Sequence, residues 1–332
     1  MSAESPRTSP SRGLSRREML GQTAKSGAVL GGSAALCQLL WDPGDPTGEL
    51  DQRQRQVRDF RQPLAPGAVQ LAVAENSRSP VELTRKALSM MGGMDRFVGR
   101  GDVVAIKPNI GWDRMPVHAA NTNPLVVKTL VELALEAGAA RVVVTDASCN
   151  DPKRCFLRSG IWRAAHDAGA DVVLPAPHRF RELRIKGEVL DQWPVYKPLI
   201  EADKVINVPV AKHHNLCRFT AGMKNWYGLL GGRRNRLHQN IHVSIADLAT
   251  FMRPTLTVID AVRVLVRNGP QGGNIDDARD NFQVIASTDQ VAADALACSL
   301  IGERRQDIEY LRLAEQRDLG TTHYENLQRV RG

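Results

Sequence analysis

Residues 205–232 read VINVPVAKHHNLCRFTAGMKNWYGLLGG, and the architecture of the rest of the chain follows outward from them. The stretch begins with an apolar run, Val205–Val208, which is typical of a buried strand. Cationic, imidazole and polar side chains then gather among glycines and aromatic residues: Lys212, His213, His214, Arg218, Thr220, Lys224 and Asn225. Glycine allows a ligand to approach the backbone closely, and the cations and imidazoles offer anion contacts, proton transfer or metal ligation. The stretch therefore predicts a strand that leads directly into a ligand site.

Short apolar runs alternate with helix signals on both sides of this stretch. Strands are expected at residues 69–74, 103–106, 141–145, 171–174, 205–208, 255–259 and 282–287. Helices are expected at residues 80–91, 124–138, 161–168, 242–252 and 290–301. Ser79 and Asn123, each followed by proline, are typical residues for the start of a helix. This alternation predicts an α/β fold with a largely parallel or mixed sheet flanked by helices.

The composition is that of a globular protein that can bury a large core. The chain has 332 residues, of which 42% are hydrophobic and 24% charged, and a formal net charge of +8. Residues 1–40 contribute +3 of that charge, so the remainder carries only +5. No basic run is interleaved with aromatic residues, and we therefore expect no nucleic-acid partner.

The amino-terminal residues resemble an export signal. Ser15–Leu20 reads SRREML, and a short, weakly apolar stretch follows from Ser26 to Leu40. Paired arginines before such a stretch are typical of the twin-arginine signal. We therefore expect residues 1–40 to engage the twin-arginine export machinery, residues 41–67 to form a linker, and residues 68–332 to form the α/β domain. The expected location is the periplasm, with a retained signal as a possible amino-terminal membrane anchor because no clean A-x-A cleavage site follows.

The five cysteines are widely spaced and include no C-x-x-C pair. Local spacing therefore encodes neither a zinc ribbon nor a 4Fe–4S ferredoxin motif. We expect these residues to be small buried hydrophobic side chains: Cys37, Cys149, Cys155, Cys217 and Cys298.

Polar residues follow the carboxyl ends of several expected strands: Lys107 and Asn109, Asp146, Lys212 and His213, Asp260, and Asp289. In a parallel sheet these ends lie along one edge, which is where α/β folds bind ligands. We expect a catalytic group made of Lys212, His213, Lys224 and Asp260. Residues expected to bind a cofactor or small anionic ligand are Lys107, Asn109, Thr122, Asp146, Thr220 and Asn225. Asp289 is equally suited to cap the helix that follows it.

The histidines offer an alternative metal site. His213 and His214 are adjacent, so in an extended chain they face opposite sides. His238 and His242 are four residues apart and would share one face of a helix. The expected ligands of a divalent metal are His213, His238 and His242, although Gln239 stands where a zinc protease needs glutamate.

Several segments together resemble one known family: AIKPNIG at 105–111, NTNPLVV at 121–127, PVAKHH at 209–214, FTAGMKNWYGLL at 219–230, IDA at 259–261 and STDQVAADALA at 287–297. They are similar to DUF362, a family of uncharacterised proteins, over roughly residues 69–302. Many members carry ferredoxin-type cysteine clusters, and this chain departs from them in that respect. The resemblance implies no defined reaction. Two hypotheses stay open: a cofactor- or metal-dependent enzyme, and a non-catalytic binding or assembly protein for an iron–sulfur redox partner.

The export signal leads to a direct prediction. Replacing both Arg16 and Arg17 by lysine should leave the protein in the cytoplasm, because the export receptor reads the paired arginines. Fractionation of cells that express the parent and the double variant measures this. A double variant that still reaches the periplasm would contradict the assignment.

Overall fold

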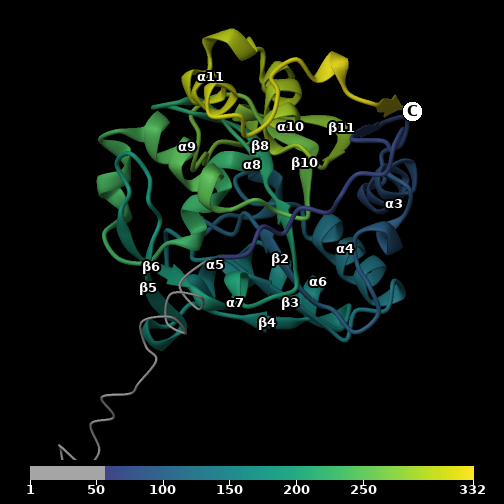
Figure 1. Cartoon of the computed structure of the whole chain (residues 1–332), viewed down its shortest axis with the longest axis horizontal. Coiled ribbons are helices and arrows are strands. Elements are labelled where there is room, and N and C mark those ends of the chain that lie inside the picture. Colours follow the sequence, from purple (N-terminus) through teal and green to yellow (C-terminus); the bar gives the residue numbers. More distant parts are fainter. Residues whose placement is uncertain (1–56) are drawn as a thin grey trace, which may run out of the picture. The chain divides into compact units, whose positions relative to one another are not determined.

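A ten-stranded sheet is the centre of residues 57–332, the part of the chain that this computed structural model describes (Figure 1). Its strands are β1 (Leu71–Ala74), β2 (Val103–Pro108), β3 (Arg141–Thr145), β4 (Asp171–Val173), β7 (Lys204–Val208), β8 (Val210–His214), β9 (Arg218–Thr220), β10 (Leu256–Leu265), β11 (Ala278–Ser287) and β12 (Arg329–Arg331). The main path runs β12-β1-β11-β10-β7-β2-β3-β4, and β8 and β9 branch from β10. The expected mixed α/β sheet is confirmed.

Helices cover both faces of the sheet (Figure 1). One face is covered by α3 (Pro80–Met90), α4 (Pro124–Glu136), α5 (Pro152–Arg158) and α6 (Ile161–Asp167). The other is covered by α7 (Lys197–Ile200), α8 (Gly222–Asn225), α9 (Ile241–Phe251), α10 (Gln290–Ala297) and α11 (Glu309–Gln316). In β2, Val104 and Ile106 pack against the first layer, whereas Ala105 packs against the second. Because strand residues alternate between faces, Lys107 points toward the second layer, where α8 lies.

Local sequence chemistry explains where the helices start. The Ser79 hydroxyl accepts a hydrogen bond from the Glu82 amide (3.3 Å), and Pro80 occupies the first turn of α3. The Asn123 side chain accepts a hydrogen bond from the Leu125 amide (2.9 Å) at the start of α4. Both helix starts agree with the sequence-based expectation, because a capping side chain and a following proline fix them locally.

A separate two-stranded sheet was not expected. It consists of β5 (Phe180–Arg184) and β6 (Gln192–Tyr196), which pair antiparallel. The Asp247 carboxylate accepts three backbone hydrogen bonds, 2.9–3.0 Å long, from the turn between these strands, at residues 188–190. Prolines and charged residues in this segment read as a loop, so the pairing could not be seen without its tertiary partner.

Two expectations about strand ends need correction. The sequence predicts a strand that ends at Ile259, but β10 continues to Leu265, so Asp260 lies inside the strand. The sequence also places Asp289 at the same edge as the other strand ends, but β11 is antiparallel to both β10 and β1. Asp289 therefore lies at the opposite end of the sheet, where its carboxylate caps α10. The connection from β10 to β11 contains no α-helix, only the single 3₁₀ turn η7 (Ile275–Asp277), and such short connections join antiparallel strands.

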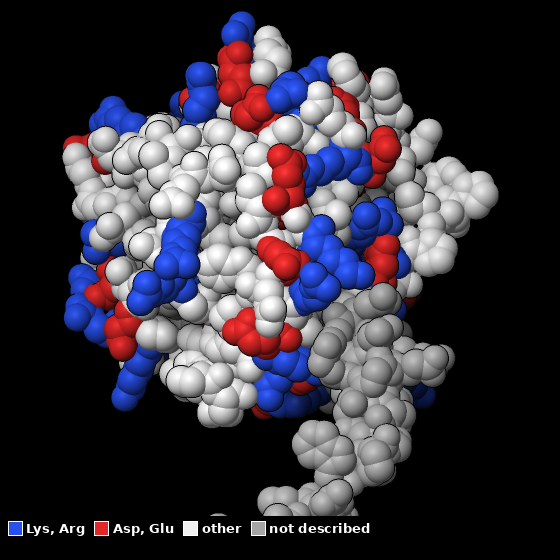
Figure 2. Space-filling view, turned by 60° about the vertical axis from the view of Figure 1, so that its left-hand side comes forward, with Lys and Arg blue, Asp and Glu red and all other residues white. Residues whose placement is uncertain are grey.

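The expected export signal lies outside the described residues, as does the linker up to residue 56. The remainder of the expected linker, residues 57–67, packs on the domain. Phe60 is buried, and its amide donates a hydrogen bond to the Arg253 carbonyl (3.0 Å). No helix within residues 57–332 is long and apolar enough to cross a membrane. On the face seen in Figure 2, basic side chains lie beside acidic ones.

Candidate functional site

A cavity of about 440 Å³ lies where β2 and β3 end, next to β8, β9 and α8. Its wall also includes η5 (Trp226–Leu229), a 3₁₀ helix, and η6 (Arg234–His238), a second one. The polar and reactive residues that line it are Asn109, Asp146, Cys149, Lys212, His214, Thr220, Lys224, Asn225, Tyr227, Arg233, Arg234, Asn235 and His238. The cavity thus gathers seven of the expected site residues: Asn109, Asp146, Lys212, Thr220, Lys224, Asn225 and His238.

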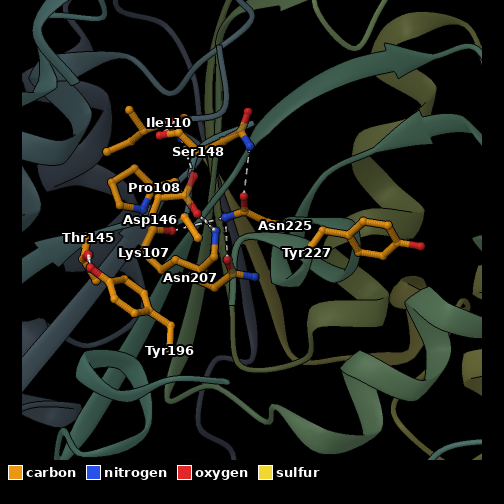
Figure 3. Close-up of polar contacts among 12 residues, drawn as sticks. Lys107, Pro108, Ile110, Thr145, Asp146, Ser148, Tyr196, Asn207, Asn225 and Tyr227 are labelled. Carbon is orange, nitrogen blue, oxygen red and sulfur yellow. Dashed lines mark hydrogen bonds and ion pairs between the residues drawn. The ribbon is translucent and has the colours of Figure 1, made fainter. Parts of the chain in front are cut away.

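A buried ion pair lies beside this cavity, and its carboxylate, Asp146, lines the wall (Figure 3). The Lys107 ammonium lies 2.7 Å from one Asp146 oxygen, and both side chains are buried. The other Asp146 oxygen accepts a hydrogen bond from the Ile110 amide (2.7 Å). Burial lowers the pKa of Lys107, and the charge of Asp146 opposes that effect. A side chain at Gly228 would overlap the Asp146 carboxylate, so only glycine lets the backbone lie against the pair.

Asn109, Asn207 and Asn225 connect this pair to the neighbouring elements, and Figure 3 labels the last two. Asn225 of α8 donates hydrogen bonds to the Lys107 carbonyl (3.2 Å) and to Asn207 of β7 (2.8 Å). Asn109 donates to Asn225 (3.2 Å) and accepts a hydrogen bond from the Lys212 ammonium (2.7 Å). This network holds β2, β7, β8 and α8 in a fixed arrangement, because each buried amide uses both its donor and its acceptor.

Lys212 lies on β8, opposite Thr220 of β9. It is almost fully buried and donates hydrogen bonds to Asn109 and to the Ala120 carbonyl (2.6 Å). Burial lowers its pKa to about 7, and the charges of Lys224 and Lys107 act in the same direction. Lys212 can therefore gain or lose a proton near neutral pH.

Lys224 is also buried, but its surroundings differ. Its ammonium lies 3.4 Å from the centre of the Tyr227 ring, and none of residues 57–332 accepts a hydrogen bond from it. Burial lowers its pKa to about 8. The Asp294 carboxylate holds the start of α8 through the amides of Gly222 (2.6 Å) and Met223 (3.1 Å). A rigid helical turn therefore directs an unsatisfied cation into the cavity.

The structure corrects the choice between the adjacent histidines. His214 lines the cavity, whereas the ring of His213 is turned toward the Gly269 amide (3.2 Å) outside the cavity wall. The alternation of β8 explains this, because Lys212 and His214 are two residues apart and share a face. The same spacing in the sequence was sufficient to identify His214.

The environment of His214 fixes its protonation. Burial and the charge of Lys224 lower its pKa to about 2, so the ring is neutral. Its Nδ1 atom accepts a hydrogen bond from the Leu216 amide (3.1 Å), which assigns the ring proton to Nε2. His214 therefore acts as a hydrogen-bond donor. A metal-ligating histidine instead donates from its second nitrogen, so this arrangement disfavours a metal at His214.

The expected metal ligands do not converge. His238 ends η6 and stacks on His214 at 6.2 Å between ring centres, whereas His242 belongs to α9 and stacks on Tyr310 at 6.4 Å. His238 and His242 do not share a helix face as expected, because η6 ends at His238 and α9 begins only at Ile241. Within residues 57–332 no group of three or more His, Cys, Asp or Glu side chains could hold a metal ion.

Two further expected residues support the site without lining it. Asp260 accepts hydrogen bonds from the amides of Asn123 (2.7 Å) and Val262 (3.0 Å), and burial raises its pKa to about 6. It therefore holds the start of α4 rather than reaching the cavity. The Thr122 hydroxyl donates to the Val208 carbonyl (2.7 Å) and accepts from the Asn109 amide (2.8 Å), which positions Asn109.

Cys149 and Arg234 are two of the cavity residues that were not among the expected site residues. Cys149 was expected to be buried but is exposed and lines the cavity, whereas Cys155, Cys217 and Cys298 are buried as expected. Arg234 donates hydrogen bonds to the carbonyls of Ala147 (2.6 Å) and Ser148 (2.5 Å). The short segment after Asp146 is thus held by an arginine that lies far from it in the sequence.

A family model described as "Domain of unknown function (DUF362)" matches residues 104–299, more than half of the chain. The chain belongs to the DUF362 family. The DUF362 match runs from β2 to the end of α10 and therefore includes the whole ion-pair and lysine arrangement. The "Thylakoid-associated protein sll1697" of Synechocystis sp. is 26% identical over 236 residues, which are 65% of this chain and 68% of that protein.

The solved structures include the lactate racemase apoprotein from Thermoanaerobacterium thermosaccharolyticum, which matches with a TM-score of 0.38 and 14% identity. The match covers 72% of this DUF362 chain and 58% of that protein, so it spans less than two thirds of the racemase.

The buried ion pair leads to a stability prediction. Asp146→Ala should lower the free energy of unfolding by about 3–5 kcal/mol, because it leaves the Lys107 ammonium buried and unpaired. Asp171→Ala is the matched control, since the Arg141–Asp171 pair is more than half exposed at a comparable 2.6 Å and should cost less than about 1 kcal/mol. Denaturant unfolding measures both. Equal losses would contradict this role of the pair.

The buried lysines lead to a prediction about pH. The folded-state pKa of Lys224, about 8, lies below its unfolded value, so its charge costs stability below pH 8. The folded state loses this cost as the pH rises from 8 to above 10. The loss of the Tyr227 contact offsets part of the gain, and Lys224→Met should stabilise the ligand-free protein by about 1–2 kcal/mol at pH 6 and by less at pH 10.

Unfolding curves at the two pH values test this, with Lys128→Met on exposed α4 surface as the control. A loss of stability in Lys224→Met at pH 6 would indicate a structural role for this lysine.

Proposed function

We propose that this DUF362 protein binds a small anionic ligand, bearing a carboxylate or phosphate group, in the cavity beside α8. The observation that carries this proposal is Lys224, a side chain that is 9% exposed and lines the cavity, and whose ammonium has no hydrogen-bond acceptor from residues 57–332. A cation that is largely removed from water and lacks a protein acceptor is unfavourable. An anion that fills this position would supply the missing acceptor.

The other groups in the cavity also favour an anion. The neutral His214 ring presents an N–H donor, and Lys212 lies on the same face of β8. Four lining side chains are cationic: Lys212, Lys224, Arg233 and Arg234. The carboxylate that they face, Asp146, is already neutralised by Lys107. The cavity therefore has an excess of positive charge in a partly desolvated space, where charge-assisted hydrogen bonds are strong.

Catalysis in this cavity is supported by Lys212. Its pKa of about 7 matches the requirement for a general acid or base at neutral pH. In this proposal Lys224 and His214 hold the anionic group while Lys212 transfers a proton at an adjacent atom. The alternative is a non-catalytic binding or assembly protein for a redox partner, and it predicts saturable binding without turnover.

The metal and iron–sulfur alternatives fit the described residues less well. A metal would need His213, His238 and His242 to converge, and they lie on separate elements. The iron–sulfur cluster of many relatives needs several thiolates, and of the cysteines within residues 57–332 only Cys149 reaches the cavity. We derive no reaction step through either group.

We also propose that the protein is exported by the twin-arginine pathway and acts in the periplasm, with residues 1–40 as the signal. Support comes from the paired Arg16 and Arg17 before the apolar stretch. This pathway would deliver the cavity already folded around its ligand.

Inorganic phosphate is a suitable probe for the anion site. Phosphate should raise the melting temperature of the parent protein above its value in chloride at equal ionic strength. Lys224→Met should lose most of this increase, since a charge-assisted contact contributes about 1.5–3 kcal/mol. The increase should also shrink as the pH rises from 6 to 9, because Lys212 and Lys224 lose their charge in that range.

Lys128→Met, on the exposed surface of α4, is the control and should respond to phosphate as the parent does. The proposal is overturned if neither phosphate nor a panel of small carboxylates raises the melting temperature of the parent. It is also overturned if Lys224→Met responds in full.

A further inference from the structure

Cys149 differs from the other cysteines within residues 57–332. It is exposed and lines the cavity, whereas Cys155, Cys217 and Cys298 are buried. Burial raises the pKa of Cys155 to about 11 and those of Cys217 and Cys298 to about 12, which keeps these thiols unreactive.

The backbone holds Cys149 in place. Its amide donates a hydrogen bond to the Gly111 carbonyl (2.9 Å), and the preceding Ser148 is held through its own carbonyl by Arg234. The Cys149 sulfur lies close to Gly111, where a Cβ atom would be 3.9 Å from Sγ and 3.8 Å from the Asn109 amide nitrogen. Because Asn109 in turn contacts the Lys212 ammonium, the sulfur belongs to the cationic part of the cavity.

The charges around Cys149 are positive. The cavity that Cys149 lines is also lined by Lys212, Lys224, Arg233 and Arg234. An electropositive, solvent-accessible site is the environment in which cysteine thiolates act as nucleophiles.

A second observation shows what such a nucleophile would meet. The Lys224 side chain is 9% exposed and lines the same cavity, and its ammonium has no hydrogen-bond acceptor among residues 57–332. A carboxylate held by Lys224 and by the His214 N–H group would place its neighbouring carbon inside the cavity that Cys149 lines. The anion site and the thiol could therefore act on one small molecule.

We propose that Cys149 is a nucleophile that forms a covalent bond with small carboxylates carrying an electrophilic carbon. This inference rests on the anion site proposed above and adds the substrate class and the reacting atom. In the reaction the thiol releases its proton to solvent, and the sulfur electron pair forms an S–C bond. The bond from that carbon to the leaving group breaks, and the leaving group departs with the electron pair. No oxidant or reductant is required.

Two alkylating reagents that differ in charge provide the test. Iodoacetate is a carboxylate, and iodoacetamide is its neutral counterpart. Both form an S–C bond at Cys149 and release iodide. The experiment uses the full chain with Cys37→Ser, at pH 7, and follows each cysteine by peptide mass spectrometry. The rate with iodoacetate divided by the rate with iodoacetamide is compared with the same ratio for free cysteine.

We expect the ratio at Cys149 to exceed that of free cysteine by about tenfold or more, because a positive cavity concentrates an anionic reagent. Lys224→Met should return the ratio toward that of free cysteine, whereas Lys128→Met should not change it. Cys155 is the internal control: its sulfur lies 3.6 Å from the same Gly111 carbonyl but is buried, so it should not react.

A ratio at Cys149 equal to that of free cysteine overturns the inference, and this measurement on the parent needs no lysine variant. The phosphate experiment on the same parent distinguishes the two proposals. If phosphate raises the melting temperature while the rate ratio at Cys149 equals that of free cysteine, the anion site is supported and the proposed role of Cys149 is wrong. If both effects are absent, the anion site itself falls.

Discussion

The buried contact between Lys107 and Asp146 constrains the rest of the site. Two charges removed from water are tolerated only when they are paired and their remaining hydrogen-bonding atoms are satisfied. Here β2 provides the cation and the residue after β3 provides the anion. Asn225 of α8 donates a hydrogen bond to the Lys107 carbonyl. The pair therefore sets the register between the strand ends and the helical turn that carries Lys224. The cavity is the space left beside this contact.

The two cavity lysines lower the stability of the empty protein and, in the proposed function, favour the binding of an anion. Lys212 has two hydrogen-bond acceptors, and Lys224 has only the face of Tyr227, yet burial lowers the pKa of both. The fold holds two cations where their charge is unfavourable, and an anionic ligand would reverse that effect. The more these two charges destabilise the empty protein, the more free energy an anionic ligand recovers when it binds. Cys149 lines the same space, where its proposed role is that of a nucleophile.

Much of the fold could be predicted from sequence, because its signals are local. β3 spans Arg141–Thr145 as expected, since an apolar run lies between polar ends. We expected residues that follow parallel strands to lie at one edge of the sheet, and Lys107, Asp146 and Lys212 do lie near one another there. This expectation failed for Asp289, because strand direction depends on the path of the connection rather than on the strand itself. Cys149 was missed because its exposure depends on contacts made by distant residues.

The position of β1 has a consequence for how the chain folds during synthesis. This strand is the first of the described strands to be made, yet its neighbours in the sheet are β11 and β12, which come last. The carboxyl terminus accordingly lies beside β1 and α3 (Figure 1). Leu71–Ala74, which is apolar, therefore has no sheet partner until most of the chain has been translated. Such a segment is vulnerable to aggregation, and contacts this distant in sequence form slowly. β1 can pair in the sheet only after β11 has been synthesised, so the sheet forms late in folding.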